Sequence, residues 1–514
     1  MQAANHLSSP FHPLDEQLAS LLKRLDGGAS ARGLTTLVRH VSARTREGVI
    51  AVPLLDMPVA ELLDSPVVGR EGDYKPLIVS DTHAWLYRYW LYEKRLAECI
   101  QARMRDGKLM IISGGPGTGK TTRVTRLLAE AIAAGTPVAR ILLAAPTGKA
   151  AMRMLESIRD TRQREAITGA MPEQASTLHR LLGFLPNRVA FRHTAHHPLP
   201  ADLVIVDEAS MIDISLMTHL FEAVPPQAML ILLGDKDQLA SVETGSIFRD
   251  LCSGEALAAQ MTLLQTSYRF NEADGIGQLA QAIRAADETR LLDVLTSAEF
   301  ADVTLDEAYT GLDADWLRTG WQDYVAAVKA GELAAIFNAF NALRILTPLR
   351  QGRLGVEGLN PWVDGVMQRL LPAHERAQRP WYVGRPVMVT QNDYRQNLFN
   401  GDIGIALPNE AGELRVWFPA GAAGEYRAVA PIRLPAHETA WAMTIHKSQG
   451  SEFTRVLLIL PEADDLPLLG RELLYTAVTR AKQGIHILAS RAMLGKALRT
   501  VTPPSSQLQE RLQA

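Results

Sequence analysis

The stretch KLMIISGGPGTGKTTR, residues 108–123, decides the fold of this chain. Its apolar run 109–112 predicts a strand, and the glycines that follow match the spacing G-x-x-x-x-G-K-T from Gly114 to Thr121. Glycines at this spacing let successive backbone N–H groups face one anion. Because the helix-forming sequence 120–134 follows directly, the strand, loop and helix together predict a phosphate-binding loop.

The loop predicts both a nucleotide and a metal ion. Lys120 is expected to reach the β- and γ-phosphates, and the Thr121 hydroxyl is a ligand for Mg²⁺. A glycine-rich turn without function is the plain alternative, and the flanking strand and helix argue against it. The predicted nucleotide contacts are Gly114, Gly115, Pro116, Gly117, Thr118, Gly119, Lys120, Thr121 and Thr122.

Composition limits the class of protein. A chain of 514 residues with 47% hydrophobic content can form two to four globular domains. The net charge of −3 provides no global positive field, so any nucleic-acid surface must be local. Cys99 and Cys252 are too few for a disulfide framework and lack metal-ligand spacing, so we expect no zinc site. The first residues lack a signal-peptide pattern, and no long apolar run occurs, so we expect a cytoplasmic protein.

The N-terminal block, residues 1–105, shows helical periodicity and no chemical motif. We expect a helical domain that docks a partner. Its aromatic residues between Trp85 and Tyr92 are read as core, with stacking on bases or on a partner as the alternative.

Residues 106–275 alternate apolar runs with helical patterns, which is typical of a parallel sheet covered by helices on both faces. The expected strands are 109–112, 141–146, 203–210 and 229–235. Polar motif residues follow each run. Since ligands bind at the carboxyl ends of parallel strands, we expect these residues to converge on one site.

Four further segments complete the predicted order of domains. Residues 185–200 suggest a hairpin, whose His196 and His197 lack the carboxylate or cysteine neighbours of a metal site. Residues 276–340 are alanine-rich and are expected to bridge two lobes. A second α/β unit, 341–502, contains strands near 343–350, 454–461 and 486–490, and short strands within 384–440 predict an inserted small β-barrel. Residues 503–514 are expected to form a frayed tail.

Acidic and polar residues after the strands suggest hydrolysis. Asp207 follows the run LVIV and is suited to Mg²⁺, while Glu208 beside it can orient and deprotonate an attacking water. Gln238, in GDKDQL, is suited to sensing a γ-phosphate or a water. Arg269 and Arg480 are candidates for stabilising charge on the transferring phosphoryl group, although each alone would be read as a surface cation.

An ordered set of motifs spans about 370 residues, and it resembles superfamily 1 helicases: GGPGTGKTT, APTGKAA, STLHRLLG, VIVDEASMID, GDKDQLASVETG, TSYRF, TIHKSQGSEF and YTAVTRAK. Within that group, STLHRLLG, DEASMID, TPLRQGRLGVEGLN, NGDIGIAL and TIHKSQGSEF are similar to the RecD family, the alpha subunits of exodeoxyribonuclease V. The resemblance is strong over 105–490 and loose before it.

The resemblance implies an α/β fold with two RecA-like lobes, ATP between them, and ATP-driven movement along single-stranded DNA in the 5′→3′ direction. It implies a strand-separating pin at 185–200 and an SH3-like barrel at 384–440. It also implies a heterotrimer with a RecB-type nuclease-helicase (beta) and a RecC-type scaffold (gamma) acting on duplex DNA ends in double-strand break repair. The residues that it places along the DNA are Pro146, Thr147, Thr177, His179, Thr444, His446 and Ser448.

Three alternatives stay open on the sequence. A stand-alone RecD-like helicase would share every motif and differ only in the N-terminal block. A structural ATP-binding subunit would keep Lys120 but lose Glu208 or the arginines, which this chain retains. A P-loop kinase would need an acceptor site and a lid, and it would not explain TIHKSQGSEF or the second α/β unit.

Overall fold

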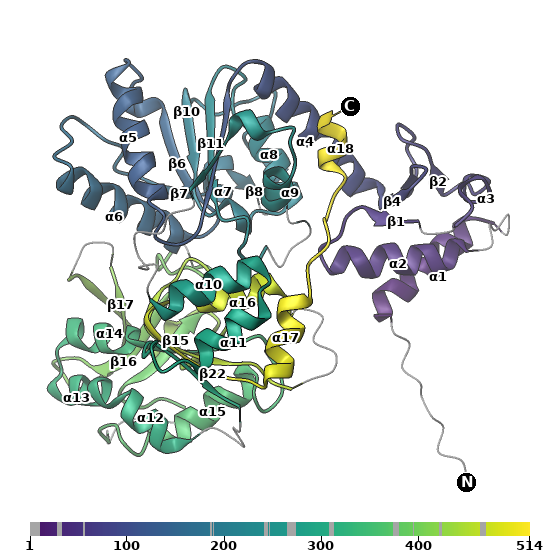
Figure 1. The fold of residues 1–514 in the computed structure, drawn as a ribbon. Coiled ribbons are helices and arrows are strands. Elements are labelled where there is room, and N and C mark those ends of the chain that lie inside the picture. Colours follow the sequence, from purple (N-terminus) through teal and green to yellow (C-terminus); the bar gives the residue numbers. More distant parts are fainter. Residues whose placement is uncertain are drawn as a thin grey trace, which may run out of the picture.

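The computed structural model describes residues 11–27, 33–54, 57–185, 188, 190–240, 245, 247–264, 274–307, 313–373, 380–393, 395–420, 424–462 and 469–513. Two parallel sheets form two lobes, a separate antiparallel sheet is inserted in the second lobe, and a smaller N-terminal region packs beside the first lobe (Figure 1). Among the residues described, no helix has both the length and the apolar character needed to cross a membrane.

Lobe 1 contains a parallel sheet in the order β12-β5-β11-β10-β6-β7. The four predicted strands are confirmed, and two short edge strands, β7 and β12, were not predicted. Side chains alternate between two cores, because Ile111 packs with helices α4 and α8 and Ile112 packs with α5 and α6. The strands are β5 (Leu109–Gly114), β6 (Ile141–Ala145), β7 (Ser176–Thr177), β10 (Leu203–Val206), β11 (Met229–Gly234) and β12 (Met261–Leu264). The helices are α4 (Tyr87–Arg105), α5 (Lys120–Ala133), α6 (Gly148–Arg164), α7 (Leu178–Leu182), α8 (Ile214–Ala223) and α9 (Ile247–Ser253).

Lobe 2 contains a second parallel sheet in the order β13-β22-β21-β14-β20. The three predicted strands of this lobe are confirmed. Its strands are β13 (Val303–Asp306), β14 (Leu343–Thr347), β20 (Ala442–Thr444), β21 (Phe453–Ile459) and β22 (Ala481–Leu488). Helices α15 (Val356–Met367), α16 (Arg471–Val478) and α17 (Arg491–Arg499) pack on it.

The prediction that 276–340 bridges the lobes is wrong. Its four-residue strand β13 pairs with β22 at the edge of the second sheet. The helices α10 (Gly275–Ala285) and α11 (Glu288–Thr296) share one core with α16, and α12 (Ala314–Gly320), α13 (Gln322–Ala330) and α14 (Leu333–Asn341) share another with β14. The segment therefore belongs to lobe 2, because its amphipathic helices bury their apolar faces on that sheet.

The insert within 384–440 is a five-stranded antiparallel sheet. Its strands lie in the order β18-β17-β16-β15-β19, so β18 and β19 form the two edges. They are β15 (Arg385–Val389), β16 (Ile403–Pro408), β17 (Leu414–Pro419), β18 (Tyr426–Val429) and β19 (His437–Thr439). Val387, Val416 and Phe418 are buried in a core of its own.

The N-terminal region is helical, as predicted, but it also contains a small sheet. The helices are α1 (Pro13–Leu25), α2 (Leu34–Arg46) and α3 (Val59–Leu63), and the strands β1 (Val52–Pro53), β2 (Val68–Gly69), β3 (Leu77–Val79) and β4 (His83–Leu86) lie in the order β1-β4-β3-β2. These strands are too short to give a clear alternating pattern. Trp85 and Trp90 are buried, which confirms the core interpretation for both.

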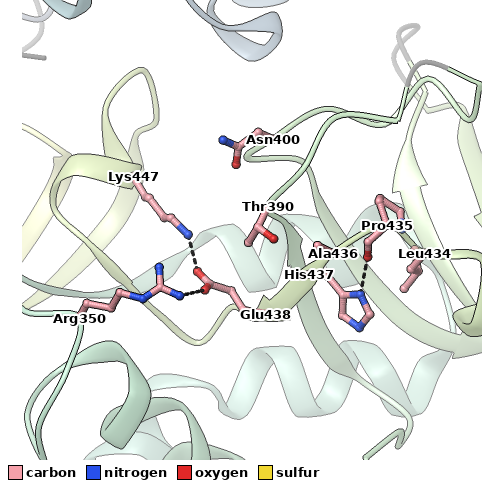
Figure 2. A pocket seen from close by; sticks show the side chains of 9 residues that line it. All are labelled: Arg350, Thr390, Asn400, Leu434, Pro435, Ala436, His437, Glu438 and Lys447. Atoms are coloured by element: carbon pink, nitrogen blue, oxygen red, sulfur yellow. Dashed lines mark hydrogen bonds and ion pairs between the residues drawn. The ribbon is translucent and has the colours of Figure 1, made fainter. Parts of the chain in front are cut away.

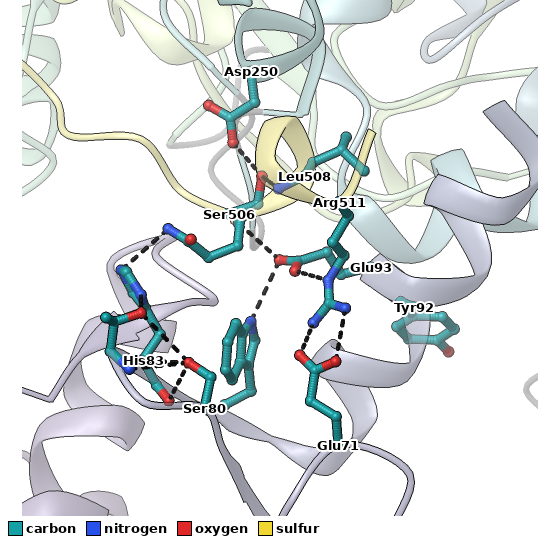
Figure 3. A network of polar contacts seen from close by, with 12 residues as sticks. Glu71, Ser80, His83, Tyr92, Glu93, Asp250, Ser506, Leu508 and Arg511 are labelled. Carbon is teal, nitrogen blue, oxygen red and sulfur yellow. Dashed lines mark hydrogen bonds and ion pairs between the residues drawn. The ribbon is translucent and has the colours of Figure 1, made fainter. Parts of the chain in front are cut away.

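The expected frayed tail is instead docked. After α17 the chain returns to lobe 1, and α18 (Leu508–Gln513) packs on α4 and α9 (Figure 1). Arg511 pairs with Glu93 at 2.6 Å and with Glu71 at 2.7 Å, and the Ser506 hydroxyl donates to Asp250 at 2.6 Å (Figure 3). The tail prediction failed because Leu508 and Leu512, the apolar side of one short helix, gave too little signal.

Candidate active site

The phosphate-binding loop lies between β5 and α5, as predicted. Gly117 and Gly119 have φ of 76° and 82°, a conformation in which a side chain would be strained. A Cβ at Gly114 would lie 2.5 Å from the Thr118 hydroxyl oxygen, so the loop requires glycine there as well. The loop folds around the Lys120 ammonium, which donates to the carbonyl oxygens of Gly114 and, at 3.1 Å, Gly115.

The carboxyl end of β10 places Asp207 and Glu208 beside this loop. Asp207 Oδ1 accepts from the Glu208 backbone N–H at 2.8 Å, and Glu208 has a left-handed backbone with φ of 53°. Burial and the neighbouring Glu208 carboxylate raise the pKa of Asp207 to about 6, against an opposing effect of Lys120. The interaction with Lys120 shows that the acidic pair and the phosphate loop share one site.

The carboxyl end of β11 adds Asp235 and Gln238. Gln238 is buried, and its Nε2 donates to Asp235 Oδ2 at 3.1 Å. Burial raises the pKa of Asp235, while Lys120 acts in the opposite direction. The structure therefore brings Lys120, Asp207, Glu208 and Gln238 to one edge of the lobe 1 sheet, as the sequence predicted.

Lobe 2 closes this site with the residue predicted from the YTAVTRAK motif. Arg480 is buried after α16, where its Nε donates to the Thr476 carbonyl at 3.1 Å and its guanidinium donates to the Ser451 carbonyl at 3.1 Å. Its charge interacts with those of Glu208 and Asp235 in lobe 1. Burial lowers the pKa of Arg480. A cation from one lobe thus faces carboxylates of the other.

Two predicted residues are less informative. Arg269 lies outside the described residues. Thr122, at the start of α5, accepts a hydrogen bond from Arg164 at 3.4 Å, so it is engaged with α6.

The residues assigned to DNA by resemblance lie on elements that face one another. Thr147 caps α6 and Thr177 caps α7, and Ala145 pairs with Thr177, so both threonines lie at one edge of the sheet. Pro146 precedes Thr147 on the same edge. Across the lobes, Gly450 lies against Ala150 of α6 and Arg153 donates to the Gly450 carbonyl.

In lobe 2 the predicted DNA residues occupy one turn. Thr444 ends β20 and its hydroxyl accepts from the Lys447 N–H at 3.3 Å, and His446 is half-buried, which lowers its pKa. Ser448, which the resemblance placed along the DNA, differs from its neighbours in this turn. It is fully buried and its hydroxyl donates to the Ile445 carbonyl at 2.7 Å, so its side chain stabilises the turn.

A polar cavity of about 670 Å³ adjoins this turn, at the junction of lobe 2 and the insert. Lys447 and Arg350 enter it from lobe 2, and both pair with Glu438 of β19, at 2.7 and 3.6 Å (Figure 2). Thr390 and Asn400 line the same cavity from the insert. Sequence reasoning missed Arg350 and Lys447 as site residues, although both lie within quoted motifs.

The predicted hairpin at 185–200 is present in the part that the structure describes. Strands β8 (Phe184–Leu185) and β9 (Ala190–Phe191) pair antiparallel, so the hairpin begins one residue earlier than predicted. His179 lies at its base, with its ring 5.7 Å from that of Phe184. Residues 186, 187 and 189 lie outside the described part of the chain.

Several residues between the lobes were missed as site residues. Tyr475 and Thr476 of α16 meet lobe 1, and Lys149 Nζ donates to the Ser451 hydroxyl at 2.7 Å. Burial, with Arg153 and Arg344 nearby, lowers the pKa of Lys149 to about 8. Their only signal in the sequence was membership of quoted motifs, because a contact between residues hundreds of positions apart leaves no local pattern.

Two family models match parts of the chain. A family model described as an AAA domain matches residues 97–244, and one described as a UvrD-like helicase C-terminal domain matches 439–488. A solved structure of Bacteroides Pif1 bound to ssDNA is 19% identical, covers 77% of this chain and 93% of that chain, and superposes with a TM-score of 0.43.

Curated relatives extend over most of the chain. The RecBCD enzyme subunit RecD of Mycolicibacterium smegmatis is 37% identical, over 92% of this chain and 90% of that protein. The same subunit of Mycobacterium tuberculosis is 42% identical over 79% and 70%, and that of Haemophilus influenzae 36% over 77% and 69%. With its P-loop and helicase motifs assembled between two lobes, the chain belongs to the RecD family of DNA helicases and is an ATP-dependent DNA helicase.

Proposed function

We propose that ATP and Mg²⁺ bind in the cleft between the lobes and that hydrolysis needs groups from both. The observation that carries this is the position of Arg480, a lobe 2 cation whose charge interacts with Glu208 and Asp235 of lobe 1. Backbone N–H groups of the phosphate loop and Lys120 hold the phosphates. The hydrogen bonds of the Lys120 ammonium to two carbonyl oxygens of the loop support this assignment.

The residues present fit a magnesium ion. The buried Asp207 carboxylate and the Thr121 hydroxyl are oxygen ligands at the edge of the phosphate loop, and Mg²⁺ takes such ligands together with nucleotide oxygens and water. The ion would neutralise charge on the β- and γ-phosphates. Thr121 and Asp207 are therefore proposed as its protein ligands.

Hydrolysis is assigned to residues around the γ-phosphate position. Glu208 orients and deprotonates the attacking water. Gln238 senses the γ-phosphate or the water. Arg480, with Arg269, stabilises the charge that develops on the phosphoryl oxygens.

The DNA strand is assigned to the edge formed by α6, α7 and the 444–448 turn. Pro146, Thr147, Thr177, His179, Thr444 and His446 are the proposed contacts, and the cavity with Arg350 and Lys447 extends this surface. Hydroxyl and backbone N–H groups hold phosphates without bulk positive charge. We assign movement to the 5′→3′ direction, strand separation to the β8–β9 hairpin, and an SH3-like barrel role to the antiparallel insert.

The chain is assigned to a heterotrimer with a RecB-type beta subunit and a RecC-type gamma subunit. This complex would unwind and degrade DNA ends during double-strand break repair in the cytoplasm. A surface on α1 supports docking, because Leu14, Leu21 and Leu25 are 55%, 43% and 57% exposed along one side of the helix. Apolar side chains gathered in this way mark interaction surfaces.

Tailed duplexes test the helicase polarity. The protein should unwind a duplex with a 5′ tail and leave one with a 3′ tail intact. Unwinding from 3′ tails alone would contradict the assigned direction and leave the helicase activity standing.

Co-purification tests the partners. The complex should form with the beta and gamma subunits, and Leu14→Asp with Leu25→Asp should reduce capture while single-strand-stimulated ATPase persists. Ile432→Asp, at an exposed apolar residue of the insert, is the matched control. A chain that unwinds DNA but captures neither subunit would instead be a stand-alone helicase.

A further inference from the structure

The loop Asp235–Leu239 follows β11 and carries Gln238. We call it the sensor loop. Lobe 2 contacts it at every second residue. The Tyr475 hydroxyl interacts with the charge of Asp235, Arg284 of α10 pairs with Asp237 at 3.0 Å, and Leu239 is held by two further side chains of lobe 2.

Leu239 is held through its backbone. Its N–H donates to the Thr476 hydroxyl at 2.7 Å, and its carbonyl accepts from Gln449 Nε2 at 2.6 Å. Both backbone polar groups of Leu239, the residue after Gln238, are thus satisfied by the other lobe. When the lobes separate, both hydrogen bonds must break, so the Leu239 end of the sensor loop is anchored in this way only in the closed arrangement.

The side chain of Gln238 depends on the same lobe. Its amide donates to Asp235, and the charge of Asp235 in turn interacts with Tyr475. The Tyr475 hydroxyl also reaches the phosphate loop, since a Cβ at Gly115 would lie 2.7 Å from it. One aromatic side chain of lobe 2 therefore lies between the phosphate loop and the carboxylate that holds Gln238.

Thr476 connects the sensor loop to Arg480. Its hydroxyl accepts from Leu239, while its carbonyl accepts from Arg480 Nε at 3.1 Å. Tyr475 and Thr476 lie in the last turn of α16, and Arg480 follows the end of that helix. The segment of α16 that positions Arg480 therefore also contacts the sensor loop that carries Gln238.

We infer that Thr476 and Gln449, assisted by Tyr475 and Arg284, are positioning residues that place Gln238 for hydrolysis only when the lobes are closed. The inference rests on the proposed role of Gln238. It means that Gln238 and Arg480 reach the nucleotide together, because one lobe 2 segment fixes both. A merely structural contact between the lobes would alter stability without this selectivity for turnover.

The first test compares variants that remove one hydrogen-bonding group. Thr476→Val keeps the shape and removes the hydroxyl, Thr476→Ser keeps the hydroxyl, and Gln449→Met removes the amide. Thr476→Val and Gln449→Met should each lower the DNA-stimulated kcat about tenfold, the scale of one lost hydrogen bond, with the KM for ATP changed less than about twofold. Thr476→Ser should stay near wild type.

Gln449 is half-buried whereas Thr476 is fully buried, so Gln449→Met remains informative if Thr476→Val does not fold. The inference is overturned if both variants keep the stimulated kcat, or if Thr476→Ser loses as much as Thr476→Val. The inference is also overturned if the KM for ATP rises by the same factor by which the DNA-stimulated kcat falls.

A double-mutant cycle with Gln238→Ala asks whether the effect passes through Gln238. In that background, Gln449→Met should lower kcat no further. Full additivity would overturn the inference. If Gln238→Ala alone keeps full turnover, the proposed role of Gln238 is wrong and the route through it fails as well. If Gln238→Ala is impaired and Gln449→Met and Thr476→Val are not, only the positioning role fails.

Discussion

Two junctions hold this molecule together across long stretches of sequence, and they are built differently. At the cleft, hydrogen bonds and partly exposed ion pairs join loops and helix ends, as in Leu239 with Thr476, Lys149 with Ser451 and Arg284 with Asp237. At the C-terminal junction, α18 joins the N-terminal region to lobe 1 through charged groups around Glu93, which is fully buried (Figure 3).

The difference indicates which junction moves. Hydrogen bonds and partly exposed ion pairs at a cleft contribute little net stability and can be exchanged for water when the lobes part. Opening the C-terminal junction would leave Glu93 as a buried carboxylate without its arginine, which is far more costly. We therefore expect the cleft to open during turnover and the C-terminal junction to stay closed.

The largest expected effect removes the cleft's phosphate contact. Lys120→Gln deletes the ammonium inside the phosphate loop, so ATPase turnover should fall by about 10³-fold or more while the fold persists. Steady-state ATPase with single-stranded DNA measures this. Lys94→Gln, on the exposed side of α4, should change nothing. Near wild-type hydrolysis by Lys120→Gln would show that the site assignment is wrong.

Arg480→Ala removes the cation that lobe 2 contributes to the cleft. DNA-stimulated kcat should fall about 10³-fold, while nucleotide affinity changes much less, because the lost interaction belongs mainly to the transition state. Arg480→Lys should rescue poorly, since an ammonium lacks the planar fork. Equilibrium binding of a fluorescent nucleotide beside the rate separates the two quantities. Unchanged stimulated turnover would make Arg480 a structural cation.

Arg511→Met breaks the C-terminal junction. It removes the cation from both ion pairs and leaves Glu93 buried without a partner cation, so the free energy of unfolding should fall by about 3 kcal/mol, measured by urea unfolding. ATPase of the folded protein should stay near wild type. Arg499→Met, which breaks an exposed pair with Glu288, should cost less than about 1 kcal/mol. Loss of turnover without loss of stability in Arg511→Met would reverse the roles given to the two junctions.

The smallest effect concerns pH at the cleft. Burial lowers the pKa of Lys149 to about 8 in the folded protein, whereas its ordinary value is 10.5. Between those values the unfolded chain binds more protons, so this group's contribution to stability should rise with pH. The unfolding free energy of the wild type should therefore rise relative to that of Lys149→Met as the pH increases from 8 to 10. A flat difference would show that the side chain is solvated.

The sequence predicted the chemistry of lobe 1 well because strand, loop and residue type coincide there. The strand β5, the glycines of the phosphate loop and the Asp207–Glu208 pair each obey a local rule, and parallel strands bring their ends to one edge. Lobe 2 was predicted less completely. Strand β13 has four residues, which do not differ locally from a loop between helices, and so the segment was assigned to a bridge.

Local sequence patterns could not predict the contacts between segments that lie far apart in the chain. Nothing near Leu508 signals that it meets α4, and nothing in YTAVTRAK separates Tyr475 and Thr476 from ordinary helix residues. Ser448 shows the opposite failure, because a motif position implied a DNA contact while its hydroxyl is used inside the turn. Residue type indicates which groups could react, but only the packing of the lobes decides which groups meet.

One measurement tests most directly whether turnover requires the lobes to move apart. A Cβ at Gly450 of lobe 2 would lie 3.9 Å from Ala150 Cβ of lobe 1, within the range of a disulfide, so Ala150→Cys with Gly450→Cys should crosslink the closed cleft. The left-handed backbone at Gly450 adds modest strain. The oxidised protein should bind nucleotide yet lose multiple-turnover ATPase and unwinding, and a reductant should restore both. Full unwinding by the oxidised, crosslinked protein would contradict the account.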